Sequence, residues 1–201
     1  MRKVFYFHRM KKLRLLCFAL LLTGFAIGQS SIRCLIRTSL GDITVELYPD
    51  KAPLTVMNFM KYVDTHLYDD THFFRTVRLD NQPDNAVKIE VIQGGDVLPV
   101  HELPPVQHET TRQSGILHKD GTISMARTND PDSATSQFFL NLVNNSDKLD
   151  PSAAPNGYAV FGKIIKGLDV LDKMAQVPTH SVGAYDDVPA KPVVLISATV
   201  K

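Results

Sequence analysis

The feature that most constrains the fold of this 201-residue chain is a succession of short segments with strand-like alternation. Each is rich in apolar, β-branched or aromatic residues, and turn-forming residues separate it from the next. The eight segments are residues 32–38, 43–49, 72–77, 88–93, 122–127, 136–143, 158–165 and 191–200. Many strands and few helices predict a β-barrel or a sandwich, and an apolar fraction of 44% is sufficient for one well-filled domain.

Two other segments follow helical spacing, residues 52–65 and residues 168–175. Their apolar residues recur three and four positions apart, which is typical of amphipathic helices. The repeated positions are Val56, Phe59, Met60 and Val63 in the first segment and Leu168, Leu171, Met174 and Ala175 in the second. We expect these two helices to cover the open ends of a barrel.

The N-terminal residues 1–28 have the composition of a secretory signal peptide. Basic residues come first, the apolar run Leu15 to Leu22 follows, and small residues precede a cleavage site after Gly28. A membrane anchor is the alternative, but the apolar run is shorter than the roughly 20 residues of a spanning helix. The sequence therefore predicts a periplasmic or secreted protein without stable membrane insertion after cleavage. Translation from Met10 would leave a more usual signal peptide than translation from Met1.

Charge and cysteine content argue against several classes of function. Residues 29–201 hold 16 basic and 21 acidic residues, a net charge of −5, which does not predict a nucleic-acid-binding protein. Cys34 is the one cysteine after the signal peptide, and its apolar neighbours favour a small buried strand residue. His101, His108 and His118 lack a regular ligand spacing, so we interpret them as solvated loop residues and expect no metal and no cofactor.

The segment SATSQFFLNLV, residues 133–143, has two different faces if it forms a strand. Its apolar face consists of Phe138, Leu140 and Leu142, and its other face of Gln137, Phe139 and Asn141. An aromatic ring between two amides is unusual for a dry core and for an ordinary surface. The pattern predicts a strand with one core face, and alternation alone leaves open what the second face contacts.

Five motifs in order resemble the cyclophilin family of peptidyl-prolyl isomerases. They are FFRTV at 73–77, VIQGGD at 91–96, GTISMAR at 121–127, SATSQFFLN at 133–141 and GYAVFGKIIKGLDVLDKM at 157–174. The C-terminal residues 177–200 resemble periplasmic bacterial members more specifically. The resemblance implies that residues 29–201 form a closed eight-stranded antiparallel β-barrel capped by two α-helices, with the active groove outside the barrel.

The resemblance also implies an activity, the acceleration of X-Pro bond isomerisation during folding of exported proteins. Its substrates would be proline-containing polypeptides, and we expect a monomer. Arg75 and Gln93 take the catalytic positions, although an arginine seen in isolation is more often a surface residue in an ion pair. The substrate-binding positions are Val91, Ala126, Arg127, Gln137, Phe139, Leu149 and Tyr158.

Several departures from the family pattern leave alternatives open. Glu90-Val91 replaces a phenylalanine-methionine pair, and the segment between Arg75 and Gln93, around residues 77–90, is about ten residues longer than usual. Lys148 stands where many members, including those that bind cyclosporin tightly, carry tryptophan. A non-catalytic peptide-binding module or chaperone on the same barrel is the alternative function. A small-ligand carrier is disfavoured because large side chains are expected to fill the barrel.

Overall fold

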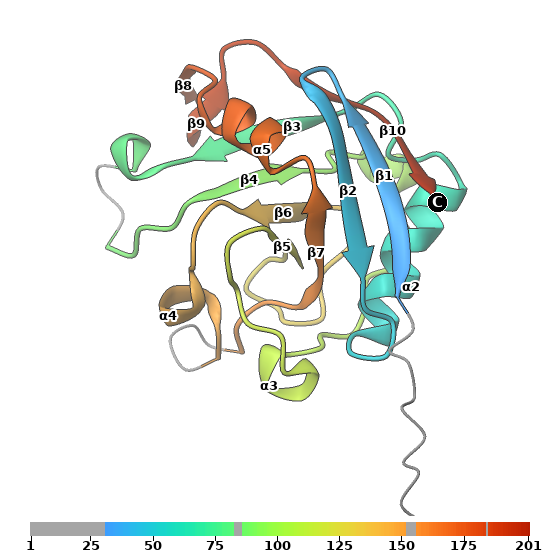
Figure 1. The fold of residues 1–201 in the computed structure, drawn as a ribbon. Coiled ribbons are helices and arrows are strands. Elements are labelled where there is room, and N and C mark those ends of the chain that lie inside the picture. Colours follow the sequence, from blue (N-terminus) through green and yellow to red (C-terminus); the bar gives the residue numbers. More distant parts are fainter. Residues whose placement is uncertain (1–30, 83–85, 152–155, 184) are drawn as a thin grey trace, which may run out of the picture.

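The computed structural model describes residues 31–82, 86–151, 156–183 and 185–201 (Figure 1). The predicted signal peptide, residues 1–28, lies outside the described residues. No helix among the described residues is long and apolar enough to cross a membrane.

A closed antiparallel barrel of eight strands forms the body of the molecule, as the resemblance implied. Around the barrel the strands follow one another in the order β1-β10-β3-β4-β6-β5-β7-β2. Their bounds are β1 Ile32–Thr38, β2 Gly41–Leu47, β3 Thr71–Val77, β4 Val91–Gly94, β5 Thr122–Met125, β6 Phe138–Asn141, β7 Val160–Lys166 and β10 Val193–Val200. Each strand overlaps one of the eight predicted segments, and β4, β5 and β6 are shorter than predicted.

Large apolar side chains fill the inside of the barrel. Phe138 is fully buried, and its ring centroid lies 5.5 Å from that of Phe59, 5.5 Å from that of Tyr68 and 5.8 Å from that of Phe73. Leu140 is also fully buried, whereas Leu142 is partly buried beyond the end of β6. The apolar face predicted for this strand is therefore the face that forms the core.

Two glycines allow the chain after β4 to approach its neighbours closely. A Cβ atom on Gly94 would lie 2.6 Å from the ring of Phe73. Gly95 has φ of +81°, a conformation that favours glycine, and a Cβ there would lie 2.8 Å from the carbonyl oxygen of Ser136. The pair therefore serves packing against the barrel core.

The two predicted helices are α2, Pro53–Asp64, and α5, Leu168–Ala175. Helix α2 packs against β10, and α5 packs against β2 and β3 (Figure 1). Leu171 and Met174 are buried as expected, but Leu168 is half exposed and Val170 is buried in its place. Leu168 is the first helical residue, after Gly167, so the buried apolar stripe of this short helix begins two residues later than predicted, at Val170.

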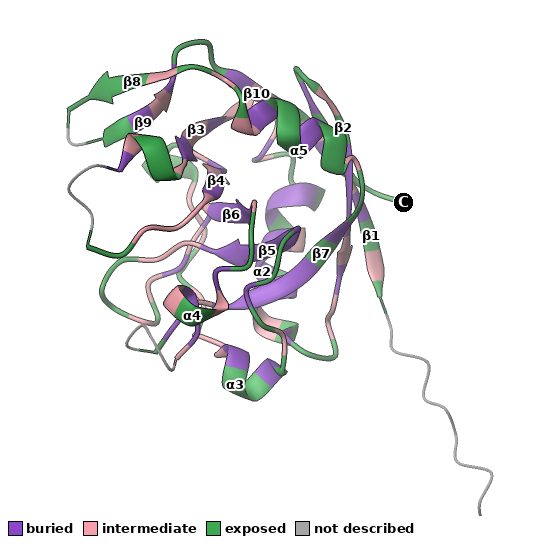
Figure 2. Cartoon of the chain, turned by 60° about the vertical axis from the view of Figure 1, so that its left-hand side comes forward, coloured by how far each residue is buried: buried purple, intermediate pink, exposed green. Residues whose placement is uncertain are grey.

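Several shorter elements have no counterpart among the predicted segments. They are the one-turn helices α3 Thr111–Ser114 and α4 Ser146–Leu149, the 3-10 turns η1 Leu79–Asn81 and η2 Pro99–His101, and the strands β8 Thr179–Val182 and β9 Tyr185–Pro189. Strands β8 and β9 pair with each other as a separate two-stranded sheet. This hairpin lies at the edge of the molecule beside β3 (Figure 2).

Cys34 is a fully buried residue of β1, which confirms its interpretation as a small core residue. Burial raises the pKa of its thiol to about 12, so the reactive thiolate is not formed near neutral pH.

Candidate functional site

A groove with a volume of about 510 Å³ lies on the outer side of β3, β4 and β6. All nine predicted site residues line it: Arg75, Val91, Gln93, Ala126, Arg127, Gln137, Phe139, Leu149 and Tyr158. Seven further residues of the described part of the chain line it as well: Val77, Ile89, Glu102, Thr128, Ser133, Thr135 and Tyr185. Residues predicted from separate motifs are thus brought into one concave surface.

Strand register explains how the central residues meet. Arg75 on β3 pairs with Gln93 on β4, and Gln93 pairs with Phe139 on β6. Residues that pair across antiparallel strands project to the same face of the sheet. Because Phe138 points into the barrel, its neighbour Phe139 points outward, and the same holds for the residues aligned with Phe139.

The apolar end of the groove is a small cluster separate from the barrel core. Val77, Val91, Phe139 and Leu149 are each at least nine-tenths buried, and Ile89, Ala126 and Tyr158 pack against them. The Tyr158 ring meets the Phe139 ring edge-on, with centroids 5.7 Å apart. This end offers a rigid apolar surface of the size of a small ring. Val77 and Ile89 were not predicted, although each stands two residues from a predicted site residue, Arg75 or Val91, and strand alternation indicates them.

Contrary to the prediction, His118 is not a solvated loop residue. It is fully buried, and its Nδ1 donates a hydrogen bond to Asp150 Oδ1 at 2.6 Å. Its ring lies parallel to that of Phe139 at 5.9 Å, so it supports the groove from behind. Burial lowers the pKa of His118 below its ordinary value, although the hydrogen bond to Asp150 opposes this shift. His101 is exposed and His108 is partly exposed, as expected for loop residues.

Asn141 shares a strand face with Gln137 and Phe139 by alternation, but it does not line the groove. Its side chain is fully buried, and Nδ2 donates to Ser124 Oγ at 3.2 Å and to Thr122 Oγ1 at 3.1 Å. Its Oδ1 accepts a hydrogen bond from Asn145 Nδ2 at 3.0 Å. The amide therefore ties β6 to β5 and to the loop before α4. These hydrogen bonds explain why a polar residue, Asn141, occupies this buried strand position.

The Arg75 guanidinium is held on several sides. Nε donates to Asp187 Oδ1 at 2.9 Å and Nη2 donates to Asp187 Oδ2 at 2.8 Å. Nη1 donates to Gln93 Oε1 at 3.0 Å, and Gln93 Nε2 in turn donates to Gln137 Oε1 at 2.8 Å. The guanidinium carbon lies 4.8 Å from the centre of the Tyr185 ring. Arg75 is thus in an ion pair and lines the groove at the same time.

Asp187 and Tyr185 were not predicted to contact Arg75. Both belong to β9, a five-residue strand outside the barrel with no clear alternation. By sequence, the acidic pair Asp186-Asp187 in a polar stretch is typical of a solvated loop. Only the tertiary contact between β9 and β3 buries the carboxylate of Asp187.

Arg127 contributes its side chain to the groove more clearly than its backbone. Nε and Nη2 donate to the carbonyl oxygen of Gly157 at 3.0 and 2.6 Å, and the guanidinium carbon lies 4.7 Å from the centre of the Tyr158 ring. The backbone N–H of Ala126 donates to the carbonyl oxygen of Gln137 at 2.9 Å. That N–H is therefore occupied by the pairing of the barrel with the loop before β6.

Polar side chains line the other end of the groove. Glu102 Oε1 accepts hydrogen bonds from Thr135 Oγ1 at 2.9 Å and from Ser136 Oγ at 3.0 Å. Thr128 and Ser133 stand nearby and are linked by a hydrogen bond between their hydroxyls of 2.8 Å. The groove therefore combines the apolar cluster around Phe139, the Arg75 cation and a set of polar side chains.

Comparison with known proteins gives the family. The family described as cyclophilin type peptidyl-prolyl cis-trans isomerase/CLD matches residues 33–200. A peptidyl-prolyl cis-trans isomerase of Acinetobacter baylyi is 38% identical over 196 residues, which cover 96% of each chain. Peptidyl-prolyl cis-trans isomerase A of Dickeya dadantii is 42% identical over 175 residues, which cover 85% of each chain.

A solved structure agrees with this assignment at the level of the fold. The cyclophilin type isomerase of Cryptosporidium parvum superposes with a TM-score of 0.68 at 21% identity, over 86% of this chain and 98% of that one. Together with the sequence matches and the barrel, this leads to one conclusion: the chain belongs to the cyclophilin-type peptidyl-prolyl cis-trans isomerases.

Proposed function

We propose that the groove isomerises X-Pro bonds of exported polypeptides and that Arg75 is its catalytic residue. The observation that carries this proposal is the position of the Arg75 guanidinium, fixed by Asp187 and Gln93 beside the apolar cluster around Phe139. A proline ring resting on Phe139, Leu149 and Tyr158 brings the prolyl nitrogen toward this cation. The crystal structure of the Cryptosporidium parvum isomerase determined in the presence of the dipeptide Ala-Pro supports a proline-containing ligand.

To isomerise an X-Pro bond faster, the site must weaken the resonance of the prolyl amide. Rotation about an X-Pro bond is opposed by a barrier of about 18–20 kcal/mol, because the nitrogen lone pair is delocalised into the carbonyl. A hydrogen bond from Arg75 to the prolyl nitrogen localises that lone pair in the twisted transition state. The apolar wall holds the ring while the carbonyl side turns. No proton is transferred and no covalent bond is broken, so an arginine, which stays charged at physiological pH, is a suitable donor.

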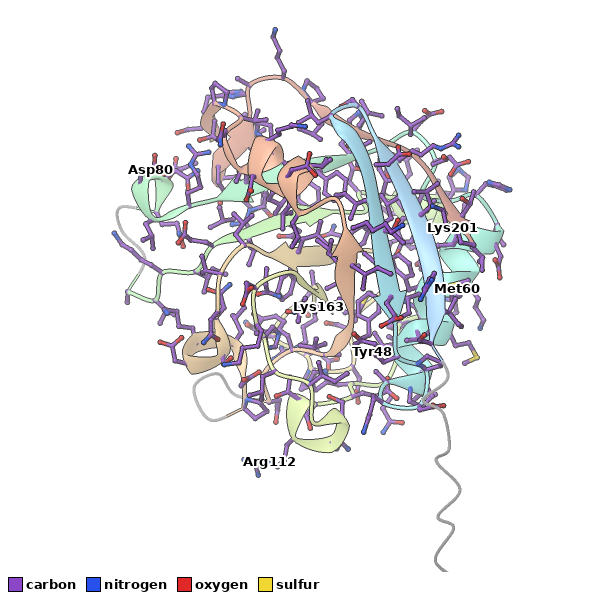
Figure 3. The ribbon with its side chains drawn as sticks, in the orientation of Figure 1. Tyr48, Met60, Asp80, Arg112, Lys163 and Lys201 are labelled. Carbon is purple, nitrogen blue, oxygen red and sulfur yellow. The ribbon has the colours of Figure 1, made fainter. Side chains whose placement is uncertain are left out.

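The role of Arg75 is tested by Arg75→Ala in a peptide isomerisation assay. Loss of an oriented, charged hydrogen bond in the transition state should cost about 3 kcal/mol, roughly a hundredfold in kcat/KM. Arg112→Ala is the matched control, because Arg112 is exposed on α3, at the bottom of the view in Figure 3, and does not line the groove. A folded Arg75→Ala protein with full activity would show that Arg75 is not the catalytic residue. Retained peptide binding without turnover in the wild type would favour the non-catalytic module.

The cellular context is a second part of the proposal. The signal peptide predicted in residues 1–28 supports export, with polypeptides that fold after export as substrates. Mass spectrometry of the protein from cell-envelope fractions should find a chain that begins near Gln29. A cytoplasmic protein that retains Met1 or Met10 would contradict export, without affecting the role of Arg75.

A further inference from the structure

The β8–β9 hairpin is an addition to the barrel with a fixed attachment. Figure 2 shows it at the edge of the molecule, largely exposed. Strand β9 packs against β3, the strand that carries Arg75. At the base of the hairpin, Thr179 Oγ1 accepts a hydrogen bond from Asn81 Nδ2 at 3.1 Å. Arg78 Nη1 donates to the carbonyl oxygen of Val177 at 3.1 Å. The long segment between Arg75 and Gln93 thus anchors the hairpin.

One side chain of this exposed hairpin is a buried acid. Asp187 is 4% exposed, whereas its neighbour Asp186 is exposed. A carboxylate loses much of its hydration on burial, and only a close cation with good hydrogen-bond geometry compensates. Both oxygens of Asp187 accept from Arg75, at 2.9 and 2.8 Å, in the side-on bidentate arrangement. The buried part of the hairpin is therefore directed at the residue proposed to be catalytic.

The remaining donors of Arg75 follow from these contacts. Of the five N–H groups of a guanidinium, the hydrogen bonds among the described residues use three, two toward Asp187 and one toward Gln93. One N–H on Nη1 and one on Nη2 remain. Because Asp187 takes the Nε edge side-on, the remaining N–H of Nη2 lies at the distal end of the fork, in a side chain that lines the groove.

Tyr185 restrains the same group from another direction. Its ring centre is 4.8 Å from the guanidinium carbon, and the ring is half exposed and lines the groove. A ring over one guanidinium face limits rotation of the plane, while the bidentate contact limits rotation within the plane. Two residues of β9 therefore restrict the orientation of Arg75 in complementary ways.

We propose that the β8–β9 hairpin is a positioning device for the catalytic arginine, with Asp187 as its positioning residue. This inference rests on the proposed role of Arg75. Asp187 also offsets part of the Arg75 charge, which by itself weakens the pull on the prolyl nitrogen. Orientation is the larger effect, because a donor held in line with the nitrogen in the transition state needs no rearrangement during the reaction.

The decisive variant is Asp187→Asn, which keeps the size of the side chain and removes one of the two acceptors. We expect kcat to fall by about ten- to a hundredfold, the scale of a misplaced catalytic group, with KM changed by less than about twofold. Asp186→Asn is the matched control: it removes the same charge from the adjacent residue, which points to solvent, and should leave kcat unchanged.

The double variant separates positioning from stability. In an Arg75→Ala background, Asp187→Asn should cause no further loss of activity, because there is no guanidinium left to orient. In the wild type, the Arg75 Nε–H should give a resolved NMR signal with slow exchange, and Asp187→Asn should broaden or shift it. Unchanged or increased kcat in Asp187→Asn would overturn the positioning role. If Arg75→Ala itself retains activity, the proposed function fails instead.

Folding is the remaining control. Asp187→Ser is a second variant that removes the carboxylate without placing amide hydrogens against the Arg75 donors. It should fold, as judged by circular dichroism, and should show the same selective loss of kcat. Failure of both Asp187 variants to fold would identify the ion pair as a structural support and would also overturn the proposal.

Discussion

At the scale of single residues, the groove is supported by a histidine that is buried although it belongs to a loop, His118. His118 stands behind Phe139, and its Nε2 is buried without a hydrogen-bond partner among the described residues. Because the Asp150 carboxylate accepts from Nδ1, the neutral ring carries its proton on Nδ1. Protonation of Nε2 would place an additional buried N–H beside two aromatic rings, those of Phe139 and Tyr158.

This environment predicts a pH dependence of stability. The pKa of His118 is lowered in the folded protein, so the unfolded chain takes up the proton first, near pH 6.5. The neutral His118 ring therefore makes its full contribution to folding stability above about pH 6.5. This contribution decreases as the pH falls toward the lower pKa of His118 in the folded protein. When the pH is lowered from 7.5 to 5, the free energy of unfolding measured with urea should decrease more for the wild type than for His118→Asn. Equal losses would contradict this assignment.

Lys148 leads to a prediction about inhibitor binding. Its ammonium pairs with the exposed Asp147 at 2.9 Å, and its side chain does not line the groove. A hydrated ammonium gives little apolar contact to a cyclic peptide such as cyclosporin, so binding should be weak. Lys148→Trp should tighten binding by roughly 1–3 kcal/mol, with nearly unchanged turnover of a short peptide. Calorimetry beside an isomerisation assay checks both parts. Nanomolar binding by the wild type would contradict the alignment of this loop.

At the scale of elements, β6 shows how one strand serves two purposes. Phe138 and Phe139 are adjacent, yet one fills the barrel and the other forms the apolar end of the groove. Alternation along the strand assigns them to opposite faces. Neighbouring residues of the same type should therefore respond to substitution in different ways.

The pair gives a matched test of core against site. Phe138→Ala should lower the free energy of unfolding by about 3–5 kcal/mol, the usual cost of a large cavity, while the molecules that remain folded keep most of their activity. Phe139→Ala should cost less stability, on the order of 1–3 kcal/mol, and should lose most of the kcat/KM. Chemical denaturation and the isomerisation assay, both at low temperature, measure the two effects. Similar activity losses in both folded variants would show that the strand does not separate these functions.

At the scale of the whole molecule, the barrel core and the groove are two separate apolar clusters built on the same strands. The interior is filled by apolar side chains of the main core, whereas the groove has its own smaller cluster around Phe139. The substituted pair Glu90-Val91 illustrates this: Val91 completes the groove cluster, and the carbonyl oxygen of Glu90 accepts a hydrogen bond from Asn145 Nδ2 at 3.0 Å. The substituted residues thus contact the groove cluster and the loop before α4 and not the main core.

The sequence by itself determined the barrel strands, the helices α2 and α5 and the residues that line the centre of the groove. The strands and helices follow from period-two and helical patterns, which are local. The groove residues were predicted instead from the resemblance of their motifs to cyclophilins, and the motifs around Arg75, Gln93 and Phe139 lie on strands that pair with one another. Strand ends were less well predicted, because β4 and β6 end where pairing ends and not where alternation ends.

Tertiary structure alone decided the environment of Arg75 and His118. Asp187 follows Arg75 by 112 positions and belongs to a hairpin without a clear local pattern, so its burial depends on how β9 meets β3. His118 is in a loop by sequence, yet the packing of Phe139, Tyr158 and Asp150 removes it from water. Charge, protonation and donor direction at these residues depend on which distant groups surround them, and local periodicity carries no such information.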